Sequence, residues 1–374
     1  MSDRWDVIII GAGIVGSACA LECTRRGLRT AVVEGRGIAS GATAAGMGHI
    51  VVMDDSPAQL ALTHYSQKLW QGLSASLPAN VEYEACGTLW VAKDEDEMQE
   101  VRRKSAQFTS AGIPTVILDE KMVAEAEPHL RQPLAGALLV SSDAVLYPPS
   151  AADYLLREAI CHGAQLYSRM ALSARAGEVQ LNDGTRLRTR RIVNAGGAEA
   201  VDLDSGLPVR KRKGHLVITD RYPGFVRHQL VELGYLKSAH SLTADSVAFN
   251  VQPRRTGQIL IGSSRQYDAE DSSVDAQILA LMIERAQWYL PEIGALSAIR
   301  VWTGFRAATP DKLPLIGPCP EDESLFLATG HEGLGITTSL GTACMLVDHM
   351  QGIETKIPID PYLPARFARN ETNV

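Results

Sequence analysis

The feature that most constrains the fold is a glycine-rich turn between an apolar strand and a helix near the start of the chain. The strand is expected over 5–10, and the turn reads Gly11-Ala12-Gly13-Ile14-Val15-Gly16. A helix over Ser17–Arg26 and a strand over Arg29–Val33 follow. This order, closed by the acid Glu34, predicts a Rossmann-type βαβ unit that binds a dinucleotide.

Each part of this motif has a physical role. Gly11 allows the tight turn, Gly13 lets a diphosphate approach the backbone, and Gly16 lets the helix pack against the strand. The start of the helix presents N–H groups and the positive end of its dipole to the phosphates. Glu34 can accept hydrogen bonds from a ribose diol. The predicted nucleotide contacts are Gly11, Gly13, Ile14, Val15, Gly16, Glu34 and Gly35.

The motif alone does not separate NAD from FAD. A second loop, Ser40–His49, is small and rich in hydroxyl groups, so it suits the ribityl and diphosphate groups of a flavin; a plain surface loop is the alternative. Arg36 is interpreted as a solvated side chain rather than a partner of a 2′-phosphate. The sequence holds one GxGxxG, so a second site for NAD(P)H is not evident.

Length, charge and cysteine usage exclude several classes of protein. A chain of 374 residues suits two lobes, and a net charge of −7 without a basic stripe argues against nucleic acid as a partner. The six cysteines form no CxxC pair, so no metal site and no disulfide framework is expected. The run Val7–Leu21 with Ala18-Cys19-Ala20 has some features of a signal peptide. Because Asp3 and Asp6 dilute the basic start, we expect a cytoplasmic protein, with association at a membrane surface left open.

After residue 150, the chain is expected to contribute first to the nucleotide sheet and then to a second sheet. A strand over Arg191–Asn194 runs into Ala195-Gly196, a second turn suited to a phosphate, so 150–200 is expected to return to the nucleotide sheet. A different, antiparallel sheet is expected after it. Its predicted strands are Lys213–Asp220, Ser246–Pro253 and Gly257–Ser264. The predicted helices are Pro57–Leu77, Asp94–Ala111, Pro148–His162, Val274–Leu290 and Thr337–Met350.

From the glycine motif through GFRAATPDKLPLIGP (304–318) to DPYLPARF (360–367), the chain resembles the FAD-dependent amino acid and amine oxidoreductases of the D-amino acid oxidase family. The resemblance implies an α/β fold, α+β overall, of the glutathione reductase-2-like type. A Rossmann-type FAD-binding domain and an antiparallel-sheet substrate domain are implied. By this resemblance the FAD-binding domain comprises 1–85, 141–210 and 300–374, and the substrate domain comprises 86–140 and 211–299.

The resemblance also implies where FAD is held. The adenine contact falls on Leu172, and Ala195 and Gly196 lie at the second turn. The diphosphate and flavin-ring contacts fall on Ser40, Thr43, His49, Gly333, Leu334, Gly335, Ile336 and Thr337. The last of these loops precedes a helix, whose dipole would stabilise the flavin N1–C2=O edge as it gains negative charge. Sarcosine oxidases tether flavin through a cysteine near Trp302–Arg306, and this chain has none there, so noncovalent FAD is expected.

Arg306 matches the arginine that binds the substrate carboxylate in the family. A guanidinium pairs with a carboxylate in bidentate fashion; the alternative is an arginine that pairs with an internal acid. Tyr267 and Tyr235 are candidates for a second carboxylate contact or a lid, or are packed tyrosines. His49 and His331 are candidates for tuning charge or contacting substrate, or are structural.

The implied reaction is oxidation of the C–N bond of a small amino acid or secondary amine by hydride transfer to flavin N5, giving an imine. Substrates of D-amino acid, D-proline or hydroxyproline, glycine or sarcosine type are all open. A 2-hydroxy acid dehydrogenase and a flavin-bearing subunit that is inactive without its partner are the alternatives. Oxygen, a quinone or a partner subunit in a hetero-oligomer could each accept the electrons.

Overall fold

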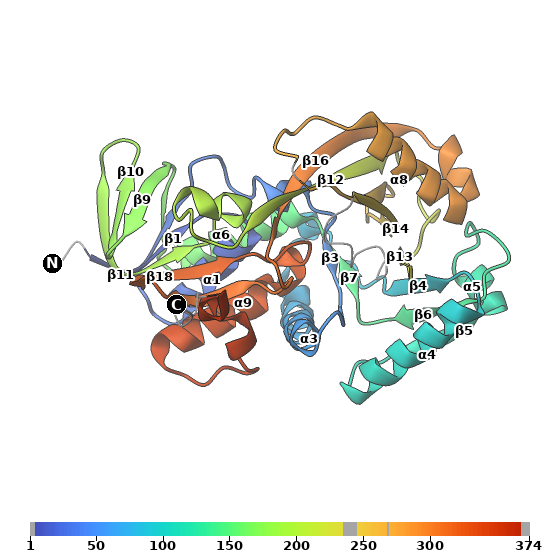
Figure 1. Cartoon of the computed structure of the whole chain (residues 1–374), viewed down its shortest axis with the longest axis horizontal. Helices are drawn as coiled ribbons and strands as arrows, with labels where there is room; N and C mark the ends of the chain where they lie inside the picture. Colours follow the sequence, from blue (N-terminus) through green and yellow to red (C-terminus); the bar gives the residue numbers. More distant parts are fainter. Residues whose placement is uncertain (1–3, 235–244, 268, 368–374) are drawn as a thin grey trace, which may run out of the picture.

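The protein is built on two large β-sheets that lie side by side along its long axis (Figure 1). The structure, a computed structural model, describes residues 4–234, 245–267 and 269–367. Each sheet has eight strands, and a two-stranded ribbon of β3 (His49–Ile50) and β7 (Ala144–Val145) lies between them.

The first sheet is mainly parallel, with β1 at its centre. β1 pairs in parallel with β2 and β11, and these pair in parallel with β8 and β18. β17 and the hairpin β9–β10 add antiparallel strands. The bounds are β1 (Arg4–Ile10), β2 (Thr30–Val33), β8 (Gln165–Tyr167), β9 (Ala171–Arg175), β10 (Glu178–Leu181), β11 (Arg186–Asn194), β17 (Leu315–Cys319) and β18 (Asp322–Thr329).

Helices cover one face of this sheet and the hairpin covers the other. Because both faces are buried, β1 is an uninterrupted apolar run over Val7–Ile10 rather than an alternating one. α1 packs against α6 and α9, and α3 packs against α9. The bounds are α1 (Ile14–Arg25), α3 (Pro57–Leu73), α6 (Pro148–Cys161) and α9 (Gly335–Gln351).

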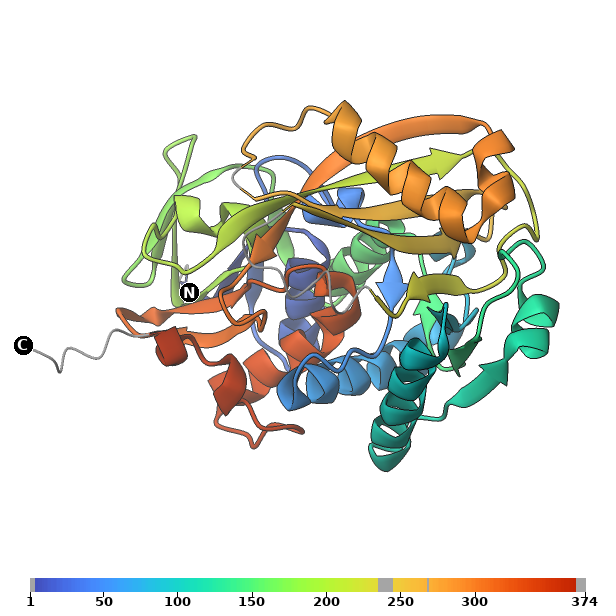
Figure 2. The same ribbon diagram turned by 45° about the vertical axis from the view of Figure 1, so that its right-hand side comes forward.

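The second sheet is mainly antiparallel and follows the order β16-β12-β15-β14-β13-β4-β6-β5, with β13 and β4 parallel. Figure 2 shows α8 lying across its outer face. The strands are β4 (Thr88–Ala92), β5 (Val116–Asp119), β6 (Gly136–Val140), β12 (Arg210–Thr219), β13 (Gln229–Glu232), β14 (Ser246–Pro253), β15 (Ile259–Arg265) and β16 (Ala298–Ala308). The helices are α4 (Glu95–Ser110), α5 (Glu120–Ala126) and α8 (Ala276–Tyr289).

The two faces of the second sheet differ in chemistry. The outer face carries an apolar core shared with α5 and α8, built from alternate residues such as Leu230 and Val251. The inner face is turned toward the first sheet. Short elements complete the fold: α2 (Ala42–Ala45), η1 (Ser74–Ser76), η2 (Ala79–Val81), η3 (Gly197–Asp202), η4 (Pro291–Ala295), η5 (Asp360–Tyr362) and η6 (Pro364–Phe367).

The predicted fold class, a Rossmann-type unit joined to an antiparallel sheet, is confirmed. Several element bounds are wrong. α9 begins at Gly335, two residues before the predicted Thr337, and α3 ends at Leu73 rather than Leu77. The predicted domain boundaries stay a prediction, and β16, most of which falls in the segment 300–374, is hydrogen-bonded into the second sheet.

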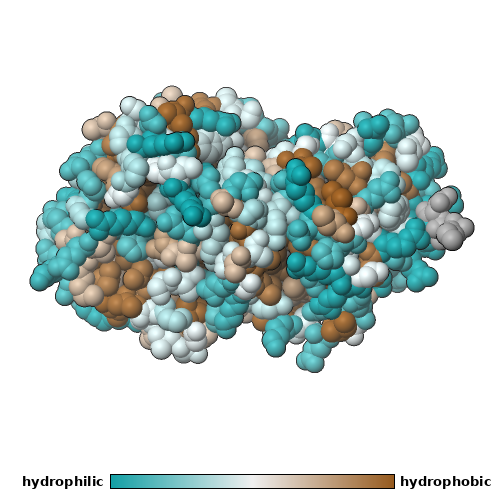
Figure 3. All heavy atoms as spheres, turned by 180° about the vertical axis from the view of Figure 1, so that it is seen from behind, coloured by the Kyte–Doolittle hydropathy of each residue, from teal (hydrophilic) through white to brown (hydrophobic). Residues whose placement is uncertain are grey.

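The surface seen from behind mixes hydrophilic and apolar residues, with apolar ones in separate patches (Figure 3). Within the described ranges, no helix is both long enough and apolar enough to cross a lipid bilayer.

Candidate active site

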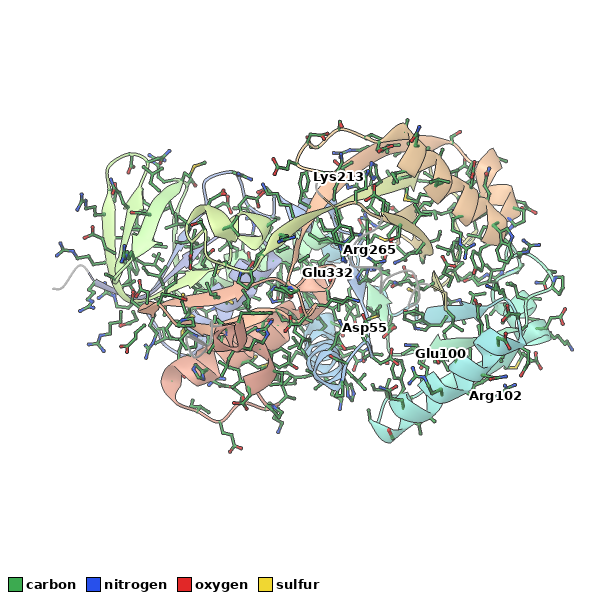
Figure 4. The ribbon with its side chains drawn as sticks, viewed as in Figure 1. Asp55, Glu100, Arg102, Lys213, Arg265 and Glu332 are labelled. Atoms are coloured by element: carbon green, nitrogen blue, oxygen red, sulfur yellow. The ribbon has the colours of Figure 1, made fainter. Side chains whose placement is uncertain are left out.

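A cavity of about 540 Å³ lies between the two sheets and is lined by residues from both. Its volume falls in the range of cofactor and small-ligand sites. Asp55, Arg265 and Glu332, all lining residues, lie around the space between the sheets in Figure 4. The cavity therefore joins the glycine-rich turn of the first sheet to the inner face of the second.

The glycine-rich turn is shaped as the motif predicts. A Cβ at Gly16 would lie 2.0 Å from the carbonyl oxygen of Gly11, so only glycine lets α1 start this close to β1. The first intrahelical bond runs from Ser17 N to Gly13 O, which leaves the amides of Val15 and Gly16 ahead of it at the positive end of the helix. Gly11, Gly13, Ile14 and Val15 line the cavity, whereas Gly16 has this packing role and is not a lining residue.

Glu34 lies at the end of β2 and lines the same end of the cavity. Its Oε2 accepts a hydrogen bond from Ala12 N at 2.8 Å, and its Oε1 accepts from Arg36 N at 2.7 Å. These bonds fix the carboxylate at the turn, where its remaining lone pairs suit a ribose diol. Arg36 also lines the cavity; its side chain is largely exposed and pairs with Glu199 at 3.1 Å, so it is not simply a solvated group.

Other predicted nucleotide contacts surround this end. Gly35 and Leu172 line the cavity beside the start of β9, and Ala195 and Gly196 line it where β11 ends. Leu172 is 55% exposed, which is unusual for a leucine on a strand. A flat aromatic ligand packed against the side chain would lower this exposure.

The loop Ser40–His49 contacts the amino end of α1 directly. Ser40 and Thr43 line the cavity, and Thr43 Oγ1 accepts a hydrogen bond from Ile14 N at 3.0 Å. Its own hydroxyl proton is then available for donation to a phosphate. The predicted role of this loop beside the diphosphate therefore fits the geometry.

A third backbone segment, Gly333–Ile336, enters the cavity at the start of α9. The positive end of the α9 dipole points at this part of the cavity, as expected for the electron-rich edge of a flavin ring. Thr337 is not a lining residue. Its hydroxyl donates to His49 O at 2.9 Å and accepts from Val51 N at 3.3 Å, so the side chain joins α9 to β3.

His49 lines the cavity beside this segment. Its Nε2 lies 3.1 Å from the Gly333 carbonyl oxygen, which requires the Nε2–H tautomer and leaves Nδ1 as an acceptor. Burial, opposed by that hydrogen bond and reinforced by the Arg306 charge, lowers the pKa of His49 to about 4. The ring is therefore neutral at physiological pH.

His331 also lines the cavity, and one of its ring nitrogens has a hydrogen-bond partner. Nε2 lies 3.0 Å from Thr342 Oγ1 on α9, and burial lowers the pKa of the imidazole to about 3. Both histidines thus line the cavity, and Nδ1 of His49 has no hydrogen-bond partner among the described residues.

Arg306, on β16, reaches across the neighbouring strand β12 into the cavity. It crosses at Gly214, where a Cβ would lie 2.4 Å from Arg306 Nη1. Nη1 donates to the carbonyl oxygen of Ser264 on β15 at 2.9 Å. The glycine in β12 thus makes room for a half-buried guanidinium whose planar fork suits a carboxylate.

Of the two candidate tyrosines, the structure describes Tyr267. Tyr267 is not a lining residue, and its hydroxyl accepts a hydrogen bond from Arg212 Nη1 at 2.9 Å. Arg212 also forms an ion pair with Glu332, which does line the cavity. Tyr267 is therefore linked to the cavity through Arg212 and Glu332. Tyr235 lies outside the described residues.

Sequence reasoning missed the polar residues of the second sheet that face the cavity. Trp90, Gln229, Asn250, Ser263 and Arg265 all line it. A signal was present in β14, where Asn250 and Gln252 alternate with Phe249 and Val251. Such alternation marks one polar face, but in an isolated sequence a polar strand face is normally assigned to solvent.

These residues fit FAD as the bound group. The helix amides, Glu34 and the α9 amino end match the diphosphate, ribose and flavin edge in turn. All six cysteines are free, and none of them lines the cavity, in keeping with flavin held without a thioether. The described residues contain no cluster of His, Cys, Asp and Glu suited to a metal ion.

Comparison with known proteins gives the same cofactor. The family model described as FAD dependent oxidoreductase (DAO) matches residues 6–349. The chain is 28% identical to hydrogen cyanide synthase subunit HcnC of Pseudomonas aeruginosa, over 98% of this chain and 97% of the relative. It is 27% identical to glycine oxidase of Geobacillus kaustophilus, over 97% of each.

Solved structures agree in fold. A crystal structure of glycine oxidase from Geobacillus kaustophilus superposes with a TM-score of 0.87 at 26% identity, covering 98% of this chain and 100% of the other. L-proline dehydrogenase from P. horikoshii superposes with a TM-score of 0.88 at 24% identity, covering all of both chains. The chain belongs to the DAO family of FAD-dependent oxidoreductases.

Proposed function

We propose that the protein oxidises the C–N bond of a small amino acid or secondary amine that carries a carboxylate. The observation that supports this most directly is the Arg306 guanidinium, which lines the same cavity as the nucleotide turn. A half-buried cation facing a cavity of this size suits an anionic substrate group. Glycine oxidase is among the relatives with the same overall length.

The residues of this chain have separable tasks in such a reaction. Arg306 binds the carboxylate and fixes the orientation of the substrate carbon. His49, neutral and buried, presents an acceptor at Nδ1 without adding charge. The α9 amino end supplies positive potential to the far side of the site. Bound FAD supplies the two-electron oxidising chemistry.

A second candidate has a specific observation in its favour. The relative HcnC is named as a subunit, and it covers nearly the whole of this chain. The protein then carries the flavin and substrate site but passes electrons to a partner rather than to oxygen. The electron acceptor, partner and compartment all remain predictions.

The test is anaerobic mixing of the FAD-loaded protein with glycine, sarcosine, both enantiomers of alanine and proline, and matched 2-hydroxy acids. We expect at least one amine to bleach the flavin absorbance and the hydroxy acids to leave it unchanged. Bleaching by hydroxy acids alone would overturn the proposal. Bleaching by an amine that oxygen does not reverse, while an artificial acceptor does, would favour the subunit.

A further inference from the structure

The inner face of the second sheet carries a row of buried polar side chains, which we call the polar floor: Trp90, Gln229, Asn250 and Ser263. They come one each from the adjacent strands β4, β13, β14 and β15. All four line the cavity, and each is less than 7% exposed. The floor is part of the sheet itself, because four strands that are neighbours in the sheet each contribute one residue to it.

The opposite face of the same strands is mainly apolar. Val91, Leu230, Val251 and Ile261 lie on it, in one core with Met282 and Ala286 of α8. A buried acid on this face, Glu232, is paired with Arg285 of α8. A sheet stabilised only by packing would be expected to carry apolar residues on its buried inner face too. Glu232 has protein partners for its charge, whereas the polar residues of the inner face lie where the cavity reaches them.

The floor presents hydrogen-bonding atoms that the described residues do not satisfy. These are Trp90 Nε1, Gln229 Oε1, Asn250 Oδ1 and Ser263 Oγ. A buried polar atom left without a partner retains its full desolvation penalty, so such atoms are expected to meet a ligand. The set includes an indole donor, two amide oxygens and a hydroxyl.

The floor begins beside the Arg306 clamp. Arg306 Nη1 bonds to the carbonyl oxygen of Ser264, the residue after Ser263. Asn250 on the neighbouring strand pairs with Gly262, the residue before Ser263.

The four floor residues are uncharged, which limits the group that they recognise. Amide oxygens need a donor, and the indole N–H needs an acceptor. A carboxylate supplies no donor, and an ammonium supplies no acceptor. A hydroxyl or a carboxamide supplies both.

We infer that the polar floor is a specificity site for a neutral hydroxyl or carboxamide group on the substrate, with Asn250 and Gln229 as its specificity-determining residues. The inference rests on the proposed function, because it takes the substrate carboxylate to bind Arg306. It adds the substrate class: amino or imino acids with a neutral polar side group.

The experiment measures the second-order rate constant of anaerobic flavin reduction for matched pairs, each as both enantiomers. The pairs are serine and alanine, asparagine and leucine, and the cis and trans 4-hydroxyprolines and proline. We expect the polar member of at least one pair to react about tenfold faster or more, equivalent to about 1.4 kcal/mol. The hydroxyl and carboxamide pairs identify which group is bound.

Asn250→Leu and Gln229→Leu keep side-chain size and remove the amide. Each should lower the rate of the polar member until the two members of the preferred pair react within about threefold of each other. Gln180→Leu, a half-buried amide on β10 in the other sheet, is the matched control and should keep the preference. Ser263→Ala is a milder second variant, useful if a leucine variant does not fold.

Three results would overturn the inference. Wild-type protein could show no preference for the polar member of any pair. The Asn250 and Gln229 variants could slow both members equally, which would mean that the floor binds the common amine. The third result is that no amine reduces the flavin at all, in which case the proposed function fails as well. The first two results leave the proposed function standing.

Discussion

At the scale of single residues, the account depends on where one guanidinium lies. The sequence identified Arg306 through its family resemblance, and the structure adds the reason that it reaches the cavity, which is the absence of a side chain at Gly214. No local pattern predicts that contact, because the two residues are 92 positions apart and meet only through the pairing of β12 with β16. Tyr267 illustrates the reverse case, a plausible residue type whose hydroxyl the fold commits elsewhere.

Replacing Arg306 with Gln should lower kcat/KM for an amino acid substrate by about 100-fold, because a charged hydrogen-bonded pair is lost. The rate on a matched amine without a carboxylate, pyrrolidine against proline, should change little. Steady-state assays of both substrates check this, with the flavin spectrum as the control for folding. An equal loss on both amines would contradict the carboxylate role.

His49 should make the protein less stable in mild acid. Burial holds the folded-state pKa at about 4, below the value of 6.5 expected after unfolding, so the unfolded chain binds the proton first. The stability from the neutral ring is present above pH 6.5 and is lost as pH falls toward 4, by about 2 kcal/mol between about pH 7 and about pH 5. Urea unfolding of wild type and His49→Gln should show a smaller pH difference for the variant; identical differences would contradict the assignment.

At the scale of elements, secondary structure was predicted best where the hydrophobic periodicity agrees with the turn and capping residues at the ends of the segment. The order β1, α1 and β2 was predicted from a buried apolar run, a glycine turn and the acid at the end of the second strand. β14 has the predicted bounds. The edge strand β16 was not predicted, since its half-buried residues show no regular alternation and its extended conformation depends on pairing with β12. The start of α9 was placed late because Gly335 and Ile336 read as part of a glycine loop.

Two glycine-to-alanine changes in helices should have opposite effects. Gly16→Ala places a Cβ 2.0 Å from Gly11 O and should displace α1, weakening FAD binding at least tenfold and lowering stability. Gly72→Ala, near the end of α3, meets no described atom within 4 Å and should stabilise the protein by about 0.5–1 kcal/mol. Flavin fluorescence titration and thermal unfolding measure both; equal FAD affinity in the two variants would contradict the packing argument.

At the scale of the whole molecule, the site exists because two sheets of different architecture face each other. The first sheet supplies the nucleotide turn, and the second supplies the guanidinium and the polar floor. Sequence motifs could predict the first half, because its turns are local. The second half is assembled from five strands far apart in the chain, so its polar face emerges only once strand order and register are known.

Because no cysteine lines the cavity, the flavin should be released when the protein unfolds. Acid precipitation should leave the yellow colour in the supernatant and a colourless pellet. Colour that stays with the pellet after washing in denaturant would show a covalent link and contradict the prediction.

The central claim is that FAD and a substrate carboxylate share the cavity between the sheets. A crystal structure of the FAD-loaded protein with pyrrole-2-carboxylate, which resembles proline but resists oxidation, tests it most directly. The account predicts the diphosphate at the amino end of α1 and the carboxylate in contact with the Arg306 guanidinium. A flavin bound elsewhere, or a carboxylate bound away from Arg306, would contradict it.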